Sequence, residues 1–300
     1  MSAEQRQGIR QMLARTPTGS EPKNIEEQRE GFATMMSAFQ VPAGVTRTDI
    51  ELAGRRAVLV EPVRDARPGT MLYFHGGSFA LGSPETAMSL TAHLVLRTGM
   101  RAISFDYRLA PEDPFPAGVK DCFAAYRELL EQGNTAESIA VVGDSAGGAM
   151  SVTTALSARN QGVPVPACVV CFSPGGDPMR SGGSLVSRRD RDPFFTPEAL
   201  QASGERYLAG ANPDTEMASP ISRADMSGFP PLLVQVGGDE ILLDDSVHLT
   251  ERAREADVDV VLDVTAGVPH VFQAFVDHLD EAGLALDRAA LFITQHVARG

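Results

Sequence analysis

The stretch Ile139-Ala-Val-Val-Gly-Asp-Ser-Ala-Gly147 decides the fold of this 300-residue chain. Its first four residues are apolar, as in a strand buried on both faces, and a helical pattern follows it directly. Between the two, the Gly-x-Ser-x-Gly pattern predicts a sharp turn, because glycine lets the backbone bend tightly around a strained serine. The hydroxyl of Ser145 would then project from the edge of a sheet. The stretch therefore predicts a nucleophile at the end of a strand.

Apolar runs of strand length recur on both sides of this stretch, with helical patterns between them. The runs cover residues 70–75, 101–106, 138–143, 166–172, 232–237 and 258–264, and the helical patterns cover 86–97, 117–131, 146–161, 242–256 and 284–298. Continuous apolar runs are typical of parallel strands covered on both faces. A more polar, alternating pair at 48–52 and 56–62 predicts an antiparallel edge hairpin. We expect an α/β protein with about eight strands, mostly parallel, and helices on both faces.

Two regions break this alternation. Residues 1–45 carry apolar side chains at helical spacing, and residues 177–225 are rich in Pro, Gly, Ser and charge. Ligands of open α/β sheets bind beyond the carboxyl ends of the strands, so an insertion at a strand end would cover the site. We expect the two regions to form a small helical cap over a catalytic domain of residues 46–176 and 226–300. The candidates for an apolar substrate pocket, which could equally just hold the cap together, are Phe32, Met36, Phe79, Phe194 and Phe195.

A second glycine turn, His75-Gly-Gly-Ser-Phe79, follows the strand at 70–75. Backbone amides that are unpaired in such a loop can stabilise the charge that develops on a carbonyl oxygen during acyl transfer. Together with the amide of Ala146, directly after the serine, the loop would complete an oxyanion hole. On its own, the motif is also compatible with a tight turn that has no chemical role.

A nucleophilic serine needs a base, and the base needs a carboxylate that orients it. Of the six histidines, His270 lies in a turn after the last strand, where it can reach the carboxyl edge of the sheet, whereas four others lie inside helical patterns. Asp239 follows the strand at 232–237 and emerges at the same edge. The order Ser145, Asp239, His270 is the one expected of the α/β-hydrolase fold. The sequence thus predicts these three residues as a catalytic triad.

These motifs resemble those of the hormone-sensitive-lipase-like family of bacterial carboxylesterases. The resemblance rests on the glycine loop, on Asp106-Tyr-Arg-Leu-Ala-Pro-Glu112, on Gly143-Asp-Ser-Ala-Gly-Gly148, and on Asp239 and His270. It covers nearly the whole chain from residue 45 onward and implies an α/β-hydrolase fold. It also implies that the serine attacks an ester carbonyl, that the histidine transfers the proton, and that the aspartate holds the histidine.

The same resemblance places the oxyanion-hole amides on Gly77, Ser78 and Ala146, with Gly76 shaping the loop. Where the family commonly has a third glycine, this chain has Ser78, whose side chain narrows the space beside the acyl carbon. Esters of bulky alcohols are therefore expected to be poor substrates. The resemblance also suggests a homodimer, formed through the sheet edge near residues 258–264 or through the last helices.

Composition and charge narrow the expected partners. The formal net charge of −13 repels nucleic acid and anionic lipid surfaces. Without an apolar leader or a membrane-length apolar run, the chain is expected to be soluble and cytoplasmic. Cys168 and Cys171 form a C-x-x-C pattern, but a three-residue step of strand spans about 10 Å, too far for a disulfide, so we interpret both as core residues.

The sequence therefore predicts a serine carboxylesterase that hydrolyses small to medium acyl esters through an acyl-enzyme intermediate, without metal or cofactor. The expected partner is a small-molecule ester. A lactone hydrolase or a metabolite deacetylase would use the same residues. A non-catalytic receptor on this fold is expected to lack part of the triad, which this chain retains.

Overall fold

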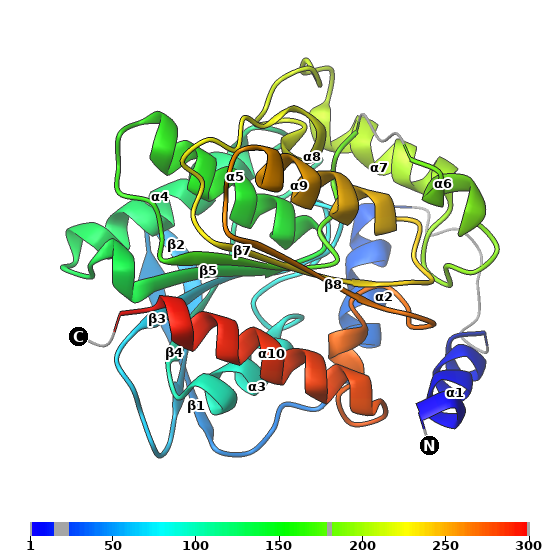
Figure 1. The fold of residues 1–300 in the computed structure, drawn as a ribbon, viewed down its shortest axis with the longest axis horizontal. Helices are drawn as coiled ribbons and strands as arrows, with labels where there is room; N and C mark the ends of the chain where they lie inside the picture. The colour runs from blue at the N-terminus through cyan, green and yellow to red at the C-terminus, as the bar shows by residue number, and fades with distance from the viewer. Residues whose placement is uncertain (1, 15–23, 179–181, 299–300) are drawn as a thin grey trace.

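The structure is a computed structural model that describes residues 2–14, 24–178 and 182–298 (Figure 1). Within these residues, eight strands form one sheet in the order β1-β2-β4-β3-β5-β6-β7-β8. They are β1 (Val45–Leu52), β2 (Arg55–Pro62), β3 (Thr70–Phe74), β4 (Arg101–Phe105), β5 (Ile139–Asp144), β6 (Cys168–Phe172), β7 (Leu232–Gly237) and β8 (Val260–Thr265). The pairs β1–β2 and β2–β4 are antiparallel, and the other neighbouring pairs are parallel. The predicted sheet and its antiparallel edge hairpin are confirmed.

Helices cover both faces of this sheet (Figure 1). One face carries α3 (Met88–Thr98) and α10 (Asp280–His296), and the other carries α4 (Ala117–Glu131), α5 (Ala146–Asn160) and α9 (Leu243–Glu255). Successive side chains of a strand point to opposite faces, so Met71 and Tyr73 of β3 pack in the core beneath α3 and α10. Leu72 and Phe74 pack in the core on the opposite face. A strand buried on both sides must be apolar throughout, which is why these strands read as continuous apolar runs.

The helices outside this alternation gather at the end of the sheet where the parallel strands finish (Figure 1). They are α1 (Ser2–Ala14), α2 (Ile25–Met36), α6 (Ser184–Ser187) and α7 (Pro197–Leu208). Two begin at side-chain caps, since Asn24 accepts a hydrogen bond from Glu27 N and Thr196 accepts one from Ala199 N. They lie where the cap was expected, and its division from the catalytic domain stays a prediction. The short elements are α8 (Pro220–Arg223) and the 3₁₀ helices η1 (Ala136–Ser138) and η2 (Phe272–Phe275).

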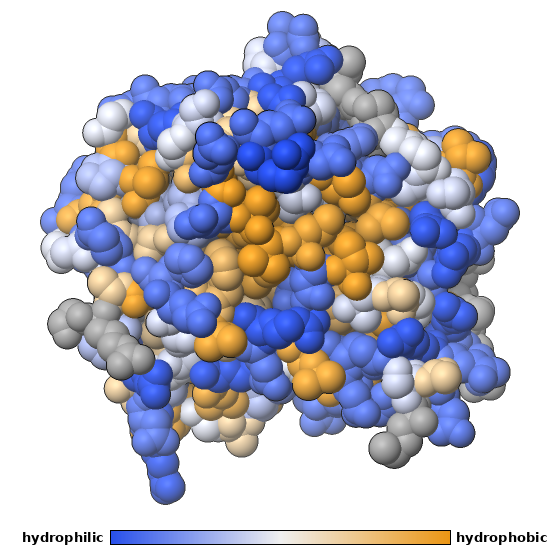
Figure 2. Space-filling view, in the orientation of Figure 1, coloured by the Kyte–Doolittle hydropathy of each residue, from blue (hydrophilic) through white to orange (hydrophobic). Residues whose placement is uncertain are grey.

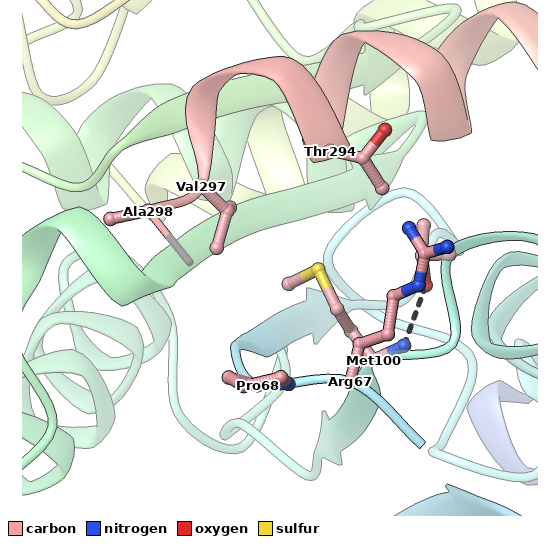
Figure 3. A pocket seen from close by; sticks show the side chains of 7 residues that line it. Arg67, Pro68, Met100, Thr294, Val297 and Ala298 are labelled. Carbon is pink, nitrogen blue, oxygen red and sulfur yellow. Dashed lines mark hydrogen bonds between the residues drawn. The ribbon is translucent and has the colours of Figure 1, made fainter. Parts of the chain in front are cut away.

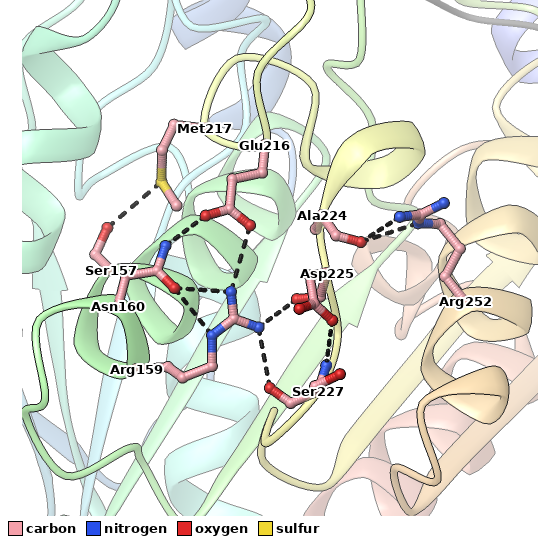
Figure 4. A network of polar contacts seen from close by, with 9 residues as sticks. All are labelled: Ser157, Arg159, Asn160, Glu216, Met217, Ala224, Asp225, Ser227 and Arg252. Carbon is pink, nitrogen blue, oxygen red and sulfur yellow. Dashed lines mark hydrogen bonds and ion pairs between the residues drawn. The ribbon is translucent and has the colours of Figure 1, made fainter.

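A polar network ties the end of the 177–225 insertion to α5 and α9 (Figure 4). Arg159 of α5 donates to the carbonyl of Asp225 and pairs with Glu216 at 3.3 Å. Arg252 of α9 donates to the carbonyl of Ala224. These bonds hold the last part of the insertion against the catalytic domain, directly before the chain enters β7.

The three cysteines are buried free thiols, which confirms the interpretation of Cys168 and Cys171 as core residues. Cys168 and Cys171 both lie in β6 and belong to the cores on opposite faces of the sheet. Burial raises the pKa of Cys168 to about 12, so this thiol stays protonated and unreactive.

Candidate active site

Ser145 stands between β5 and α5 in a strained backbone conformation, with φ 53° and ψ −119°. The flanking glycines permit this turn. A Cβ on Gly143 would lie 2.2 Å from the carbonyl oxygen of Gly147, and a Cβ on Gly147 would lie 1.9 Å from that of Phe74. The strand–turn–helix predicted for this stretch is confirmed, and close packing excludes any larger residue at either glycine.

The glycine loop after β3 is bound to the serine turn through Asp144. The Asp144 carboxylate accepts hydrogen bonds from Gly76 N at 3.1 Å and from the Tyr73 hydroxyl at 2.9 Å. His75 stacks on Tyr107, whose hydroxyl donates to the His75 carbonyl at 2.7 Å. Burial lowers the pKa of His75 to about 4, so its ring is neutral at physiological pH. The amide of Gly76 holds the loop in place through its hydrogen bond to Asp144.

Three amides beside Ser145 remain available. In the described part of the chain, the N–H groups of Gly77, Ser78 and Ala146 donate no hydrogen bond. Ser78 takes a positive φ of 54°, a conformation that is ordinary for glycine and rare for other residues. The loop thus keeps a glycine-like backbone at the position where this chain has a serine. An oxyanion bound here would meet N–H donors that have no acceptor within the described protein.

A narrow cavity of about 20 Å³ lies against Ser145. Ser78, Phe79, Ala146, Phe195, Leu200 and Leu242 are among the residues that line it. A space of this size holds about one water molecule. Of the five predicted pocket residues, Phe79 and Phe195 line the cavity. Phe194 packs with the cluster around Ile9, and Phe32 and Met36 on α2 are half-buried outside the lining.

A second cavity, of about 370 Å³, lies at the opposite end of the strands, where the parallel strands begin (Figure 3). Its lining includes Arg67, Met100 and Thr294, next to the starts of β3 and β4 and the end of α10. The hydroxyl of Thr294 is bonded within α10, to the carbonyl of Ala290. This cavity is larger, but the catalytic candidates all lie at the other end, beyond the carboxyl ends of the strands.

His270, in the turn after β8, is buried, and its Nδ1 lies 2.6 Å from Oε2 of Glu240. Glu240 is fully buried, and its other oxygen accepts hydrogen bonds from the Ser173 hydroxyl at 2.8 Å and from Gly237 N at 2.5 Å. Both carboxylate oxygens are therefore satisfied. The carboxylate that can orient the imidazole is that of Glu240.

The prediction that Asp239 holds His270 is wrong. The Asp239 carboxylate pairs with Arg10 at 2.7 Å and with Arg191. The physical reason is the tight turn after β7, in which Gly237 N bonds the Glu240 side chain and so turns it back toward the strand end. Neighbouring side chains of a turn diverge, and the residue spacing did not show which of the two would face the histidine.

Comparisons with known proteins bear on the family and the fold of the chain. A family model described as alpha/beta hydrolase fold matches residues 71–274. The crystal structure of an esterase from the bacterial hormone-sensitive lipase family superposes with a TM-score of 0.93 at 37% identity, covering 99% of both chains. The chain belongs to this esterase family. This chain, called the esterase from here on, is also 37% identical to an acetyl-hydrolase of Streptomyces hygroscopicus over 278 residues, which covers 92% of both sequences. An esterase of Acinetobacter venetianus is 38% identical over 248 residues, 82% of this chain and 80% of that one.

The predicted hormone-sensitive-lipase-like family, fold and ester hydrolase activity are thus confirmed. The esterase is a carboxylic ester hydrolase of the α/β-hydrolase fold. The helices that the structure describes are all too short or too polar to span a bilayer.

The charge state of His270 in the esterase reflects opposing effects. Burial lowers its pKa, whereas the charge and hydrogen bond of Glu240 raise it, with further contributions from Asp192 and Asp144. The net result is a pKa above the ordinary 6.5. An imidazole of raised pKa is a stronger proton acceptor, which suits it to activate a serine.

The backbone at Ser145 and the backbone next to His270 are both hydrogen-bonded to residues at the end of β6. Ser145 N donates to the carbonyl of Phe172, and Val271 N donates to the hydroxyl of Ser173, at 2.8 Å and 3.0 Å. Within the described ranges, Ser145 and His270 share no hydrogen bond; catalytic bonds of this kind often tighten only in the substrate complex. Sequence reasoning missed Ser173, although its place directly after the β6 run was a usable signal.

Proposed function

We propose that the esterase hydrolyses short-chain carboxylic esters through an acyl-enzyme on Ser145. The hydroxyl oxygen attacks the ester carbonyl while His270 takes its proton, and the protonated imidazole then returns that proton to the departing alcohol. Glu240 holds the imidazole in the required tautomer and stabilises its positive charge. Water, deprotonated by His270, then attacks the acyl carbon, and the imidazolium returns this proton to Ser145 Oγ as the acid is released.

The negative charge of each tetrahedral intermediate would be bound by the amides of Gly77, Ser78 and Ala146. Preorganised amide donors are worth several kcal/mol in a site that excludes water. The single observation that carries the proposal is the cavity against Ser145, because Ser78 and Ala146 line it as well. A carbonyl placed in it would meet the nucleophile and the donors together.

The size of that cavity supports a short acyl group. A space of about 20 Å³ accommodates a group of about the size of a methyl, and a longer chain would have to displace Leu200 or Leu242. Acetyl esters are therefore the best-fitting substrates. A relative named acetyl-hydrolase is consistent with this choice.

The test is a chain-length series of p-nitrophenyl esters, run on the wild type and on Ser145→Ala, with intact mass measured after a fluorophosphonate probe. We expect the acetate to be hydrolysed fastest, no activity in the variant, and one adduct on Ser145. Ser187→Ala, at the exposed end of α6, is the matched control and should behave like the wild type. Equal hydrolysis by the wild type and Ser145→Ala would remove the proposal.

We also propose that two copies of the esterase pair along β8. In the described chain, β8 pairs with β7 on one side and borders no strand on the other. Its Val261 and Val264 are about half exposed, as are Leu284 and Leu291 of α10. Figure 2 shows an apolar area in the middle of this face, where β8 crosses between α9 and α10. An unpaired strand edge beside exposed apolar side chains favours pairing with a second copy.

Light scattering after size exclusion tests the dimer. The wild type is expected at twice the chain mass, and Val261→Asp at the monomer mass. A monomeric wild type at micromolar concentration would contradict the dimer.

Buried free thiols support a cytoplasmic location for the esterase, because they persist in reducing compartments.

A further inference from the structure

One carboxylate of the insertion binds the loop that carries Glu240. We call residues 191–195 the cap turn and residues 237–241 the acid loop. Asp192 accepts hydrogen bonds through Oδ1 from Phe194 N at 2.8 Å and Phe195 N at 3.0 Å, within the cap turn. Its Oδ2 accepts one from Ile241 N at 2.7 Å, in the acid loop. The side chain of Asp192 thus holds the two segments together.

Both ends of this connection reach the catalytic pair. Ile241 directly follows Glu240, so the bond to its amide constrains the backbone that presents the Glu240 carboxylate. On the other side, Phe195 places its ring edge-on against His270, with the ring centroids 4.9 Å apart. Asp192 therefore bonds to Ile241 and Phe195, the neighbours of the two partners of the Glu240–His270 hydrogen bond, and makes no hydrogen bond to either partner.

Asp239 supplies a second attachment of the same loop. Its carboxylate, 5% exposed, pairs with Arg191 of the cap turn and with Arg10 of α1. The two arginines are about half exposed, so solvent screens these pairs and each contributes little by itself. Asp192 instead accepts from backbone amides of the cap turn and of the acid loop, and hydrogen bonds to an ionised carboxylate are stronger than those between neutral groups.

We propose that Asp192 is a positioning residue that couples docking of the cap turn to the orientation of His270. With the carboxylate in place, the acid loop and the Phe195 ring hold the imidazole between them. Without it, the cap turn loses its bond to the acid loop, and the Glu240–His270 hydrogen bond loosens. The kinetic consequence rests on the proposed acyl-enzyme function, whereas the loosening of the hydrogen bond does not.

The test compares Asp192→Ala with Asp190→Ala, a matched control that removes an exposed carboxylate two residues away. Two quantities are measured in each protein. The first is kcat and KM for p-nitrophenyl acetate. The second is the far-downfield proton resonance of His270 Nδ1–H, assigned by its loss in Glu240→Gln.

We expect Asp192→Ala to lower kcat by about 10- to 100-fold, because small displacements of catalytic groups have effects of this size. KM should change less than kcat, and the Nδ1–H resonance should broaden or vanish. Asp190→Ala should match the wild type in both measurements. A merely structural role of Asp192 would lower thermal stability and leave the resonance and kcat of the folded protein unchanged.

Asp192→Asn guards against a variant that does not fold. Its amide can accept from Ile241 or from the cap turn, but its NH₂ group must face a donor at the other contact. An intermediate loss of kcat and a broadened resonance are therefore expected. Wild-type kcat and an unchanged resonance in both Asp192 variants would overturn the proposal. If the wild type hydrolysed no ester, the proposed function would fail, and the resonance alone would still decide the coupling.

Discussion

Replacing Glu240 by glutamine should abolish most activity, whereas replacing Asp239 by asparagine should not. The Glu240 carboxylate faces donors on both sides, namely His270 at one oxygen, and Ser173 and Gly237 N at the other. A glutamine amide has one oxygen and one NH₂ group. In one orientation its NH₂ faces His270 and favours the wrong tautomer, and in the other it faces the Gly237 amide, donor against donor.

The size of the effect follows from the tautomer. In serine hydrolases of the Ser-His-Asp type, changing the acid to its amide lowers kcat by about 10⁴-fold, which corresponds to about 5 kcal/mol of transition-state stabilisation. Asp239 pairs with two half-exposed arginines, whereas the hydrogen bond to His270 comes from Glu240, so the loss of the Asp239 charge leaves the tautomer of the imidazole unchanged. Asp239→Asn is therefore expected to keep kcat within about tenfold of the wild type.

The assay is steady-state hydrolysis of p-nitrophenyl acetate by the two variants, with near-ultraviolet circular dichroism to verify folding. The fluorophosphonate labelling rate of Ser145 should fall in parallel with kcat for Glu240→Gln. The reasoning is refuted if Asp239→Asn shows the larger loss, or if folded Glu240→Gln stays within tenfold of the wild type.

Four further outcomes are expected. First, kcat/KM should fall on acidification with a midpoint above pH 6.5, because attack needs neutral His270 and its pKa is raised; a midpoint below 6 would contradict this. Second, burial raises the pKa of Asp144 to about 6, so the free energy of unfolding should decline by up to about 3 kcal/mol as pH rises from 4 to 6. Because the pKa of Asp144 is higher in the folded protein, its stabilising contribution is complete below the pKa of the unfolded chain and is lost above the pKa of the folded one. Urea titrations of Asp144→Asn should show no such decline of the unfolding free energy with pH. Third, Leu200→Ala should raise the butyrate-to-acetate ratio of kcat/KM by about tenfold, and an unchanged ratio would mean that Leu200 does not limit the acyl chain. Fourth, Ile9→Ala should weaken docking of α1 by about 2–4 kcal/mol, seen as faster proteolysis within residues 2–14.

The local parts of the molecule were readable from the sequence because their causes are local. A strand covered on both faces must be apolar, so the runs that became β3 to β7 were visible directly. The turn at Ser145 needs glycines at 143 and 147, since any Cβ there would collide with backbone. Chain order then placed His270 at the correct edge of the sheet.

Only the tertiary structure decided between Asp239 and Glu240. The two are adjacent, both follow β7, and both fit the order of the fold, so the choice depends on where the turn directs each side chain. Which of the predicted pocket residues contact the cavity was decided in the same way, because it depends on how the insertion and α2 dock: Phe195 lines the cavity, and Phe32 does not. Sequence patterns report burial and backbone conformation, whereas the pairing of distant side chains is set by packing between segments far apart in the chain.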